Sequence, residues 1–173
     1  MLKTARGGFM EKKQLSAQTV ANYFLSMAQK AGREVTNKKL QKLIYYAQAW
    51  SLALDNFPLF KEEIEAWIHG PVVPNIYRRY KKYGYGFIKD PGSDLHPDLA
   101  AHKSLLDEIW AVYGIYDAEY LELLSHSEDP WIFARHTLDG DEMSSAPISQ
   151  EIMRSYYTSL LAKIKARNAL SRK

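Results

Sequence analysis

The side chains best suited to chemistry in this sequence are its histidines and one serine–histidine–serine run. The five histidines are His69, His96, His102, His126 and His136. None stands in an H-E-x-x-H motif or four residues from another histidine, the spacings typical of zinc sites on a helix. Ser125 and Ser127 flank His126, but a catalytic triad needs convergence in space, and no G-x-S-x-G elbow is present. The sequence therefore predicts no metal ligand, no cofactor and no catalytic residue.

Composition limits the class of protein further. Cysteine is absent, which excludes disulfides and thiolate ligands, and neither glycine-rich phosphate-binding motif occurs. Hydrophobic residues make up 46% of the 173 residues, enough for a sizeable core in one domain. No apolar run approaches the roughly 20 residues of a membrane span, and the start has no apolar signal-peptide core. We expect a binding domain, most simply a cytoplasmic protein of bacterial type without membrane contact.

The most distinctive stretch runs from Ile64 to Gly84 and reads IEAWIHGPVVPNIYRRYKKYG. Its first six residues alternate in the two-residue period of an extended strand. A Gly-Pro pair then interrupts the strand, and Pro74 suits the first turn of a helix, where its missing N–H costs nothing. The following tyrosines recur at helical spacing up to Gly84, a typical C-cap. The stretch predicts an extended segment, a rigid corner and a short helix.

Cations and aromatic rings alternate on this short helix. Such a mixture can stack bases and neutralise phosphates, or it can face an acidic protein. Helical geometry favours tyrosines that face the core and cations that face solvent. Trp67 also fits the core, and His69 also fits a hydrogen bond that locks the corner. The residues proposed for partner contact are Trp67, His69, Tyr77, Arg78, Arg79, Lys81 and Lys82.

Apolar residues at helical spacing predict further helices along the chain. The strongest stripe, within residues 40–54, indicates a central helix, and another stripe predicts a helix over residues 99–113. The expected N-caps are Ser16, Thr36 or Asn37, Asp117, Asp129 and Ser149. The residues expected on the buried face of the last helix are Ile152, Tyr156, Leu160 and Ile164.

Together these patterns predict a mainly α-helical, compact single domain of about six or seven helices, with at most a short two-stranded β-ribbon. The ribbon would pair residues 64–68 with another extended piece, and Pro147-Ile148 is one choice. Residues 1–13 are expected to form a disordered leader, 14–165 the folded domain and 166–173 a frayed basic tail.

Four blocks of the sequence resemble the SocA/Panacea antitoxin domain family, whose members include phage-associated GepA-like proteins. The blocks are NKKLQKLIYYAQAWSLAL, LFKEEIEAWIHGPVVPNIYRRYKKYG, SHSEDPW and PISQEIMRSYY. The resemblance extends from about residue 16 to residue 157, and EAWIHGPVVPNIY is its most specific part. Its structural signature residues are Gly70, Pro71, Pro74, Asp129, Pro130 and Trp131.

The resemblance implies an antitoxin of a type II toxin–antitoxin system, which binds and neutralises a toxin protein encoded by a neighbouring gene. Family members pair with toxins of unrelated folds, and one branch acts as a proteolytic adaptor that delivers its toxin to a Clp-type protease. The leading hypothesis is therefore neutralisation by direct contact, without chemistry by this chain. A repressor that binds operator DNA is the alternative, motivated by the basic aromatic helix and tail. An enzyme that uses His69 or His126 is a third hypothesis.

Overall fold

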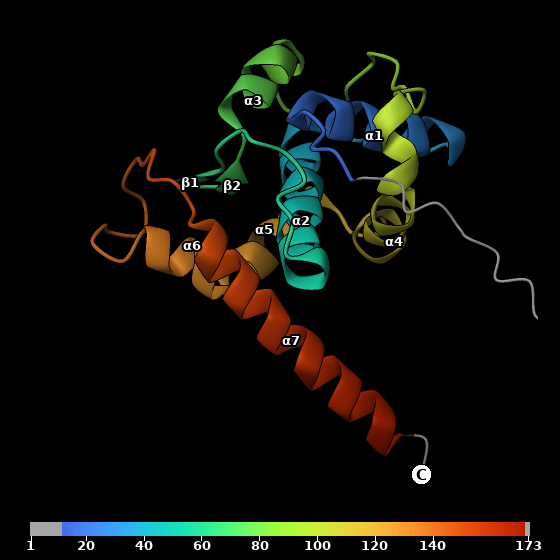
Figure 1. The fold of residues 1–173 in the computed structure, drawn as a ribbon. Coiled ribbons are helices and arrows are strands. Elements are labelled where there is room, and N and C mark those ends of the chain that lie inside the picture. The colour runs from blue at the N-terminus through green and yellow to red at the C-terminus, as the bar shows by residue number, and fades with distance from the viewer. Residues whose placement is uncertain (1–11, 172–173) are drawn as a thin grey trace, which may run out of the picture.

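The computed structural model describes residues 12–171. Within them the chain forms seven α-helices, two 3-10 helices and one two-stranded sheet (Figure 1). The expected mainly α-helical single domain is confirmed. Of the leader expected over residues 1–13, the first 11 residues lie outside the described part of the chain. The elements are α1 (Ala17–Lys30), α2 (Asn37–Asp55), β1 (Glu65–Trp67), β2 (Gly70–Val72), α3 (Pro74–Tyr80), η1 (Lys81–Tyr83), η2 (Pro97–Ala101), α4 (Lys103–Tyr113), α5 (Ala118–His126), α6 (Asp129–Ala134) and α7 (Gln150–Leu170).

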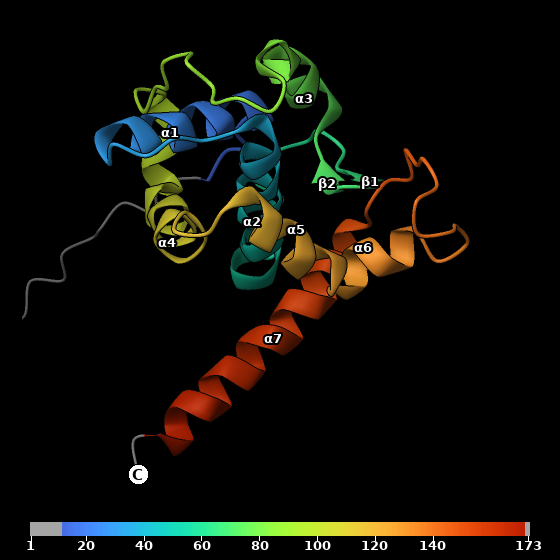
Figure 2. The same cartoon turned by 180° about the vertical axis from the view of Figure 1, so that it is seen from behind.

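Helix α2 is the central helix, as its apolar periodicity predicts. Thr36 caps it by accepting a hydrogen bond from the Lys39 N–H at 3.2 Å, and Asn56 ends it in the left-handed conformation. The helix packs against α1, α4, α5 and α7 and against strand β2. Figures 1 and 2 show α1 and α4 on one side of α2, and the hairpin with α6 on the other. Because neighbours surround α2, even some of its lysines become buried groups.

Strands β1 and β2 form a local antiparallel hairpin, whereas the sequence suggested a ribbon with a distant segment. The register pairs Glu65 with Val72. The predicted partner, Pro147-Ile148, also pairs with this segment: Pro147 bridges to Glu65, and the Ile148 N–H donates a hydrogen bond to the Ile64 carbonyl at 2.7 Å. Local pairing is possible because antiparallel strands need no more than a two-residue turn, here residues 68–69. The segment before α7 therefore lies along the outer edge of the hairpin.

Two predicted helix starts differ from the structure. The helix expected over residues 99–113 is divided between η2 and α4. His102 lies at the junction, where its buried ring places Nε2 2.7 Å from the Lys13 carbonyl oxygen. Helix α6 has Glu128 as its N-cap in place of Asp129, and the Glu128 side chain makes no capping hydrogen bond. The Glu128 carboxylate instead turns into the core, where tyrosine hydroxyls surround it.

Helix α7 buries a different face from the predicted one. Met153 and Tyr157 are its buried residues, and α2 and α6 are its neighbours. The four residues expected in the core are partly or largely exposed: Ile152, Tyr156, Leu160 and Ile164. The prediction is only partly right. Tyr156 and Leu160 are half-buried against the core and Ile164 is exposed, because the body of the molecule fully covers only the adjacent stripe of Met153 and Tyr157.

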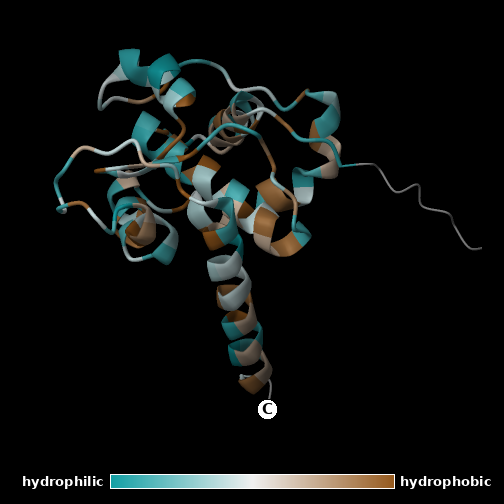
Figure 3. Cartoon of the chain, turned by 60° about the vertical axis from the view of Figure 1, so that its left-hand side comes forward, coloured by the Kyte–Doolittle hydropathy of each residue, from teal (hydrophilic) through white to brown (hydrophobic). Residues whose placement is uncertain are grey.

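The second half of α7 extends away from the body (Figure 3). Ser149 caps the helix as predicted, by accepting a hydrogen bond from the Ile152 N–H, and the helix continues to Leu170. Residues 166–170, within the segment expected as a tail, are therefore helical, and residues 172–173 lie outside the described chain. None of the helices in residues 12–171 combines the length and apolar character needed to cross a membrane.

Candidate functional site

The corner of the hairpin is built on a buried lysine of α2. Gly70 has a φ of +96°, in a region that favours glycine. A Cβ added to Gly70 would lie 2.6 Å from Lys42 Cε and 2.9 Å from Ser125 Oγ. The Lys42 amine donates a hydrogen bond to the Pro71 carbonyl at 3.3 Å. Glycine is therefore required here both for the backbone conformation and for space.

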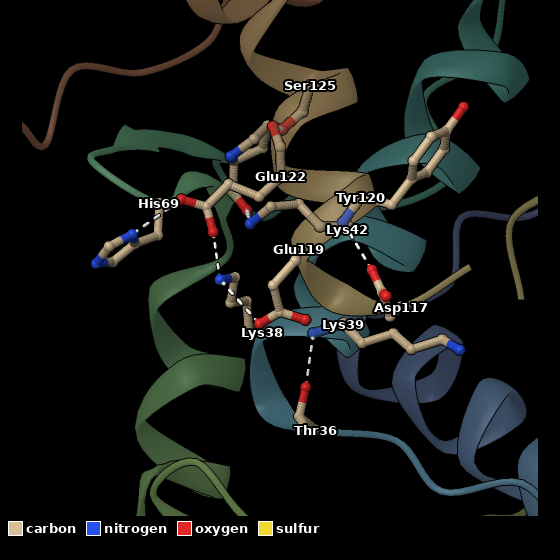
Figure 4. Close-up of polar contacts among 11 residues, drawn as sticks. Thr36, Lys38, Lys39, Lys42, His69, Asp117, Glu119, Tyr120, Glu122 and Ser125 are labelled. Carbon is tan, nitrogen blue, oxygen red and sulfur yellow. Dashed lines mark hydrogen bonds and ion pairs between the residues drawn. The ribbon is translucent and has the colours of Figure 1, made fainter. Parts of the chain in front are cut away.

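The charges around this corner form one network (Figure 4). Lys42 is 1% exposed, and this burial lowers the pKa of its amine to about 7, against the opposing attraction of Glu122. Glu122, on α5, forms an ion pair with Lys38 and a hydrogen bond with His69, whose Nδ1 lies 2.9 Å from Glu122 Oε1. Although burial opposes it, hydrogen bonding to Lys38 and His69 lowers the pKa of the Glu122 carboxyl group. The network joins α2, α5 and the hairpin, and it gives His69 a hydrogen bond at the corner.

A second buried polar cluster centres on Glu128. Tyr157 and Tyr45 donate hydrogen bonds to its Oε2 at 2.7 and 3.1 Å, and the Tyr46 hydroxyl lies 3.5 Å from its Oε1. Burial raises the pKa of the Glu128 carboxyl group to about 7, although the tyrosine hydroxyls act in the opposite direction. The cluster fastens α6 and the first half of α7 to α2. Glu128 could not be found from the sequence because its neighbours come from two other helices, α2 and α7.

The residues predicted for partner contact lie around α3, η1 and the hairpin, and the structure divides them into half-buried aromatic rings, polar groups that already have a partner and unpaired cations. Trp67 and Tyr77 are half-buried and pack edge to face, with ring centroids 4.9 Å apart. Lys82 is exposed but paired with Asp90 at 3.1 Å. Three exposed cations form no ion pair with another described residue: Arg78, Arg79 and Lys81. The predicted separation of inward tyrosines and outward cations is present, since Tyr80 is fully buried.

The histidines do not converge. His126 stacks on Trp131 with ring centroids 4.0 Å apart, and burial lowers the pKa of its imidazole. His69 lies on the surface beside Glu122, and His102 lies at the junction before α4. Among residues 12–171, no three histidine, aspartate or glutamate side chains gather in a way that could hold a metal ion. The arrangement around His69 and His126 is therefore one of packing and ion pairing.

A groove between α6 and α7 was not foreseen from the sequence. It has a volume of about 390 Å³. Phe133 forms one wall, and three residues of the second apolar stripe of α7 line the other: Ile152, Tyr156 and Leu160. Asp129 and Lys163 lie at its polar rim. The apolar periodicity that predicted burial of this stripe is present in α7, but within the described chain the stripe lines a groove.

The sequence profile described as "Antitoxin SocA-like, Panacea domain" matches residues 40–132, just over half of the chain. The antitoxin SocA of Caulobacter vibrioides (strain NA1000 / CB15N) is 32% identical over 130 residues, which cover 68% of this chain and 69% of that protein. The chain belongs to the SocA-like antitoxin family. No solved structure matches it.

Within this SocA-like chain, the six signature residues all lie inside the matched range. They build the junction between the hairpin and the helices: Pro74 opens α3, Pro130 is buried in the first turn of α6, and the Trp131 Nε1–H donates to the Trp67 carbonyl at 2.9 Å. The SocA-like profile ends at residue 132, before α7 begins. The groove face of α7 therefore lies outside the residues that the profile matches.

Proposed function

We propose that this chain is the antitoxin of a type II toxin–antitoxin pair and that it neutralises a toxin protein by binding it directly. Membership of the SocA-like antitoxin family carries the proposal, because the matching relative is itself named an antitoxin. The toxin would be the product of the neighbouring gene. Direct binding needs an accessible surface with unsatisfied charge or apolar area, and the described chain offers both.

The predicted contact surface around α3 supplies the charge. Arg78, Arg79 and Lys81 are exposed and are not neutralised by an ion pair to another described residue. Unpaired cations of this kind fit an acidic surface on a protein partner, and they accelerate its association more than they prolong the complex. Trp67, Tyr77, His69 and Lys82 lie on the same side of the molecule. On contact with the toxin, His69 would give up its hydrogen bond to Glu122 and Lys82 its ion pair with Asp90.

Co-expression with the neighbouring gene tests the proposal. The neighbour expressed alone should stop growth, and this chain expressed beside it should restore growth. A harmless neighbour, or a neighbour that stays toxic in the presence of this chain, would contradict the assignment. The amount of toxin on an immunoblot then separates two routes: bound toxin persists under occlusion, whereas toxin disappears when the chain delivers it to a protease.

A further inference from the structure

Helix α7 presents an apolar stripe that the described chain covers only in part. The residues of the stripe are four apart, so they share one side of the helix: Ile152, Tyr156, Leu160 and Ile164. The first three line the groove opposite Phe133, which is 50% exposed on α6. Ile164, one turn further, is 41% exposed. Apolar surface of this kind, continuous with a groove and rimmed by polar groups, typically marks a site of protein interaction.

The end of the helix lacks the packing that normally stabilises a helix. Every residue from 162 to 170 is exposed, and Figures 1 and 3 show this part of α7 apart from the body. A helical segment this short is marginal in water, because most helical stability in proteins comes from burial of an apolar face. Contact with another molecule would supply that burial.

The charge on α7 indicates what kind of molecule this is. Glu151 is the last acidic residue of the chain, whereas the basic residues after it are Arg154, Lys163, Lys165, Arg167, Arg172 and Lys173. Lys163 and Arg167 lie three and seven residues after Leu160, on the groove side, whereas Lys165 lies on the opposite side. A complementary partner therefore has an apolar segment flanked by acidic residues.

We propose that the groove face of α7, formed by Ile152, Tyr156, Leu160, Ile164, Lys163 and Phe133, docks an apolar, acid-flanked segment of the toxin. This inference rests on the proposed function. It names the surface whose burial should make the complex with the toxin dissociate slowly. A second copy of the chain fits less well, because it would bring the same basic residues together. Nucleic acid fits less well, because the centre of the face is apolar and a phosphate backbone would leave it exposed to water.

The test measures binding of the purified neighbouring gene product to the full chain by surface plasmon resonance. The double variant L160Q/I164Q removes apolar area from the face without changing charge, and it should weaken binding about tenfold or more, mainly through faster dissociation. The matched control T158Q/A162Q places the same new side chains on the opposite side of α7, at two exposed positions, and should bind as the unmodified chain does.

Charge reversal at the rim supplies a second test that does not disturb packing. K163E should weaken binding about threefold or more, whereas K165E, on the opposite side, should change binding much less. Circular dichroism confirms that each variant remains folded. Unchanged binding by folded L160Q/I164Q and K163E would overturn the docking site and leave the antitoxin function standing.

The remaining outcomes identify other occupants or a failure of the proposed function. A dimer of the chain that L160Q/I164Q dissociates, seen by sedimentation equilibrium, would assign the face to self-association. A DNA complex that K163E weakens and L160Q/I164Q leaves intact would assign it to nucleic acid. Either result overturns the toxin as occupant. No binding of the neighbouring product to the unmodified chain would contradict the proposed function itself.

Discussion

The hairpin corner and the groove face of α7 differ in how completely contacts within the chain pair their polar groups and cover their apolar side chains. At the corner, Gly70 fits a space with no room for a Cβ, and the amine of Lys42 is bonded to the Pro71 carbonyl. On the groove face, apolar side chains remain open and the nearby cations lack ion pairs to described residues. The buried centre of the corner has no free surface for a partner, whereas the groove face has apolar surface available for one.

The two regions also differ in their relation to the family profile. The corner lies inside the residues that match the SocA-like profile, and α7 lies beyond them. The profile match therefore includes the corner and stops before the groove face of α7. The corner, which carries the most specific motif of the sequence, has an architectural role, whereas the groove face of α7 is the surface proposed for recognition.

Substitution at the corner should have the largest effect on stability. G70A places a methyl group against the buried end of Lys42 and forces a β-carbon into a positive-φ conformation. We expect a loss of about 3 kcal/mol in the free energy of unfolding, measured by urea denaturation. Gly32 is the matched control: its φ is +61°, but no atom lies within 4 Å of an added Cβ. G32A should cost about 1 kcal/mol, and an equal loss in both variants would contradict the importance of the close contact.

The buried amine at the corner should give stability a pH dependence. Because the pKa of Lys42 is lowered to about 7 in the folded state, the unfolded chain binds more protons above that pH, and stability rises from pH 7 toward the ordinary lysine pKa of about 10.4. K42M removes this contribution. The stability of K42M relative to the unmodified chain should therefore be greatest at pH 7 and below, and should decline as the pH rises. If the unfolding free energies of K42M and of the unmodified chain changed in parallel from pH 6 to 9.5, Lys42 would not be buried as a neutral amine.

The groove face should tolerate the same kind of change that the corner does not. L160Q/I164Q alters one half-buried and one exposed residue of α7, so its loss of unfolding free energy should stay within about 1 kcal/mol. The melting temperature, measured beside that of G70A, checks this expectation. A loss as large as that of G70A would mean that the groove face belongs to the core, and the contrast between the two regions would disappear.

Charge reversal on α3 should have the smallest effect on stability and a kinetic effect on binding. R78E/R79E changes two exposed residues without ion pairs in the described chain, so the free energy of unfolding should change by about 0.5 kcal/mol or less. Association with the toxin should slow, most clearly at low salt, with little change in dissociation. The control K61E/K165E makes the same change in net charge at two other exposed lysines. Equal slowing by both variants would assign the effect to net charge alone.

Much of the fold follows from local sequence chemistry. Ser16, Asp117 and Ser149 cap the helices that they were predicted to cap, because an N-cap needs only a side-chain oxygen two or three residues before a free N–H. The corner at Gly70 was likewise predictable, since Gly-Pro followed by a second proline permits few backbone conformations.

The remaining features depend on contacts that no local pattern encodes. Lys42 and Glu128 become buried only because helices from distant parts of the chain close around them. On α7, the sequence shows two neighbouring apolar stripes, and only the three-dimensional structure shows that Met153 and Tyr157 are the pair that is covered. The residues predicted for partner contact around α3 remain a prediction, since the surface is present but its partner has not been tested.

The most direct test of the account is a calorimetric titration of the purified chain with the purified product of the neighbouring gene. We predict saturable binding at a defined stoichiometry, with a negative heat capacity change from burial of apolar surface, and a marked loss of that heat capacity change in L160Q/I164Q. Absence of binding by the folded, unmodified chain, while the same chain still protects cells from the neighbour, would contradict neutralisation by direct contact.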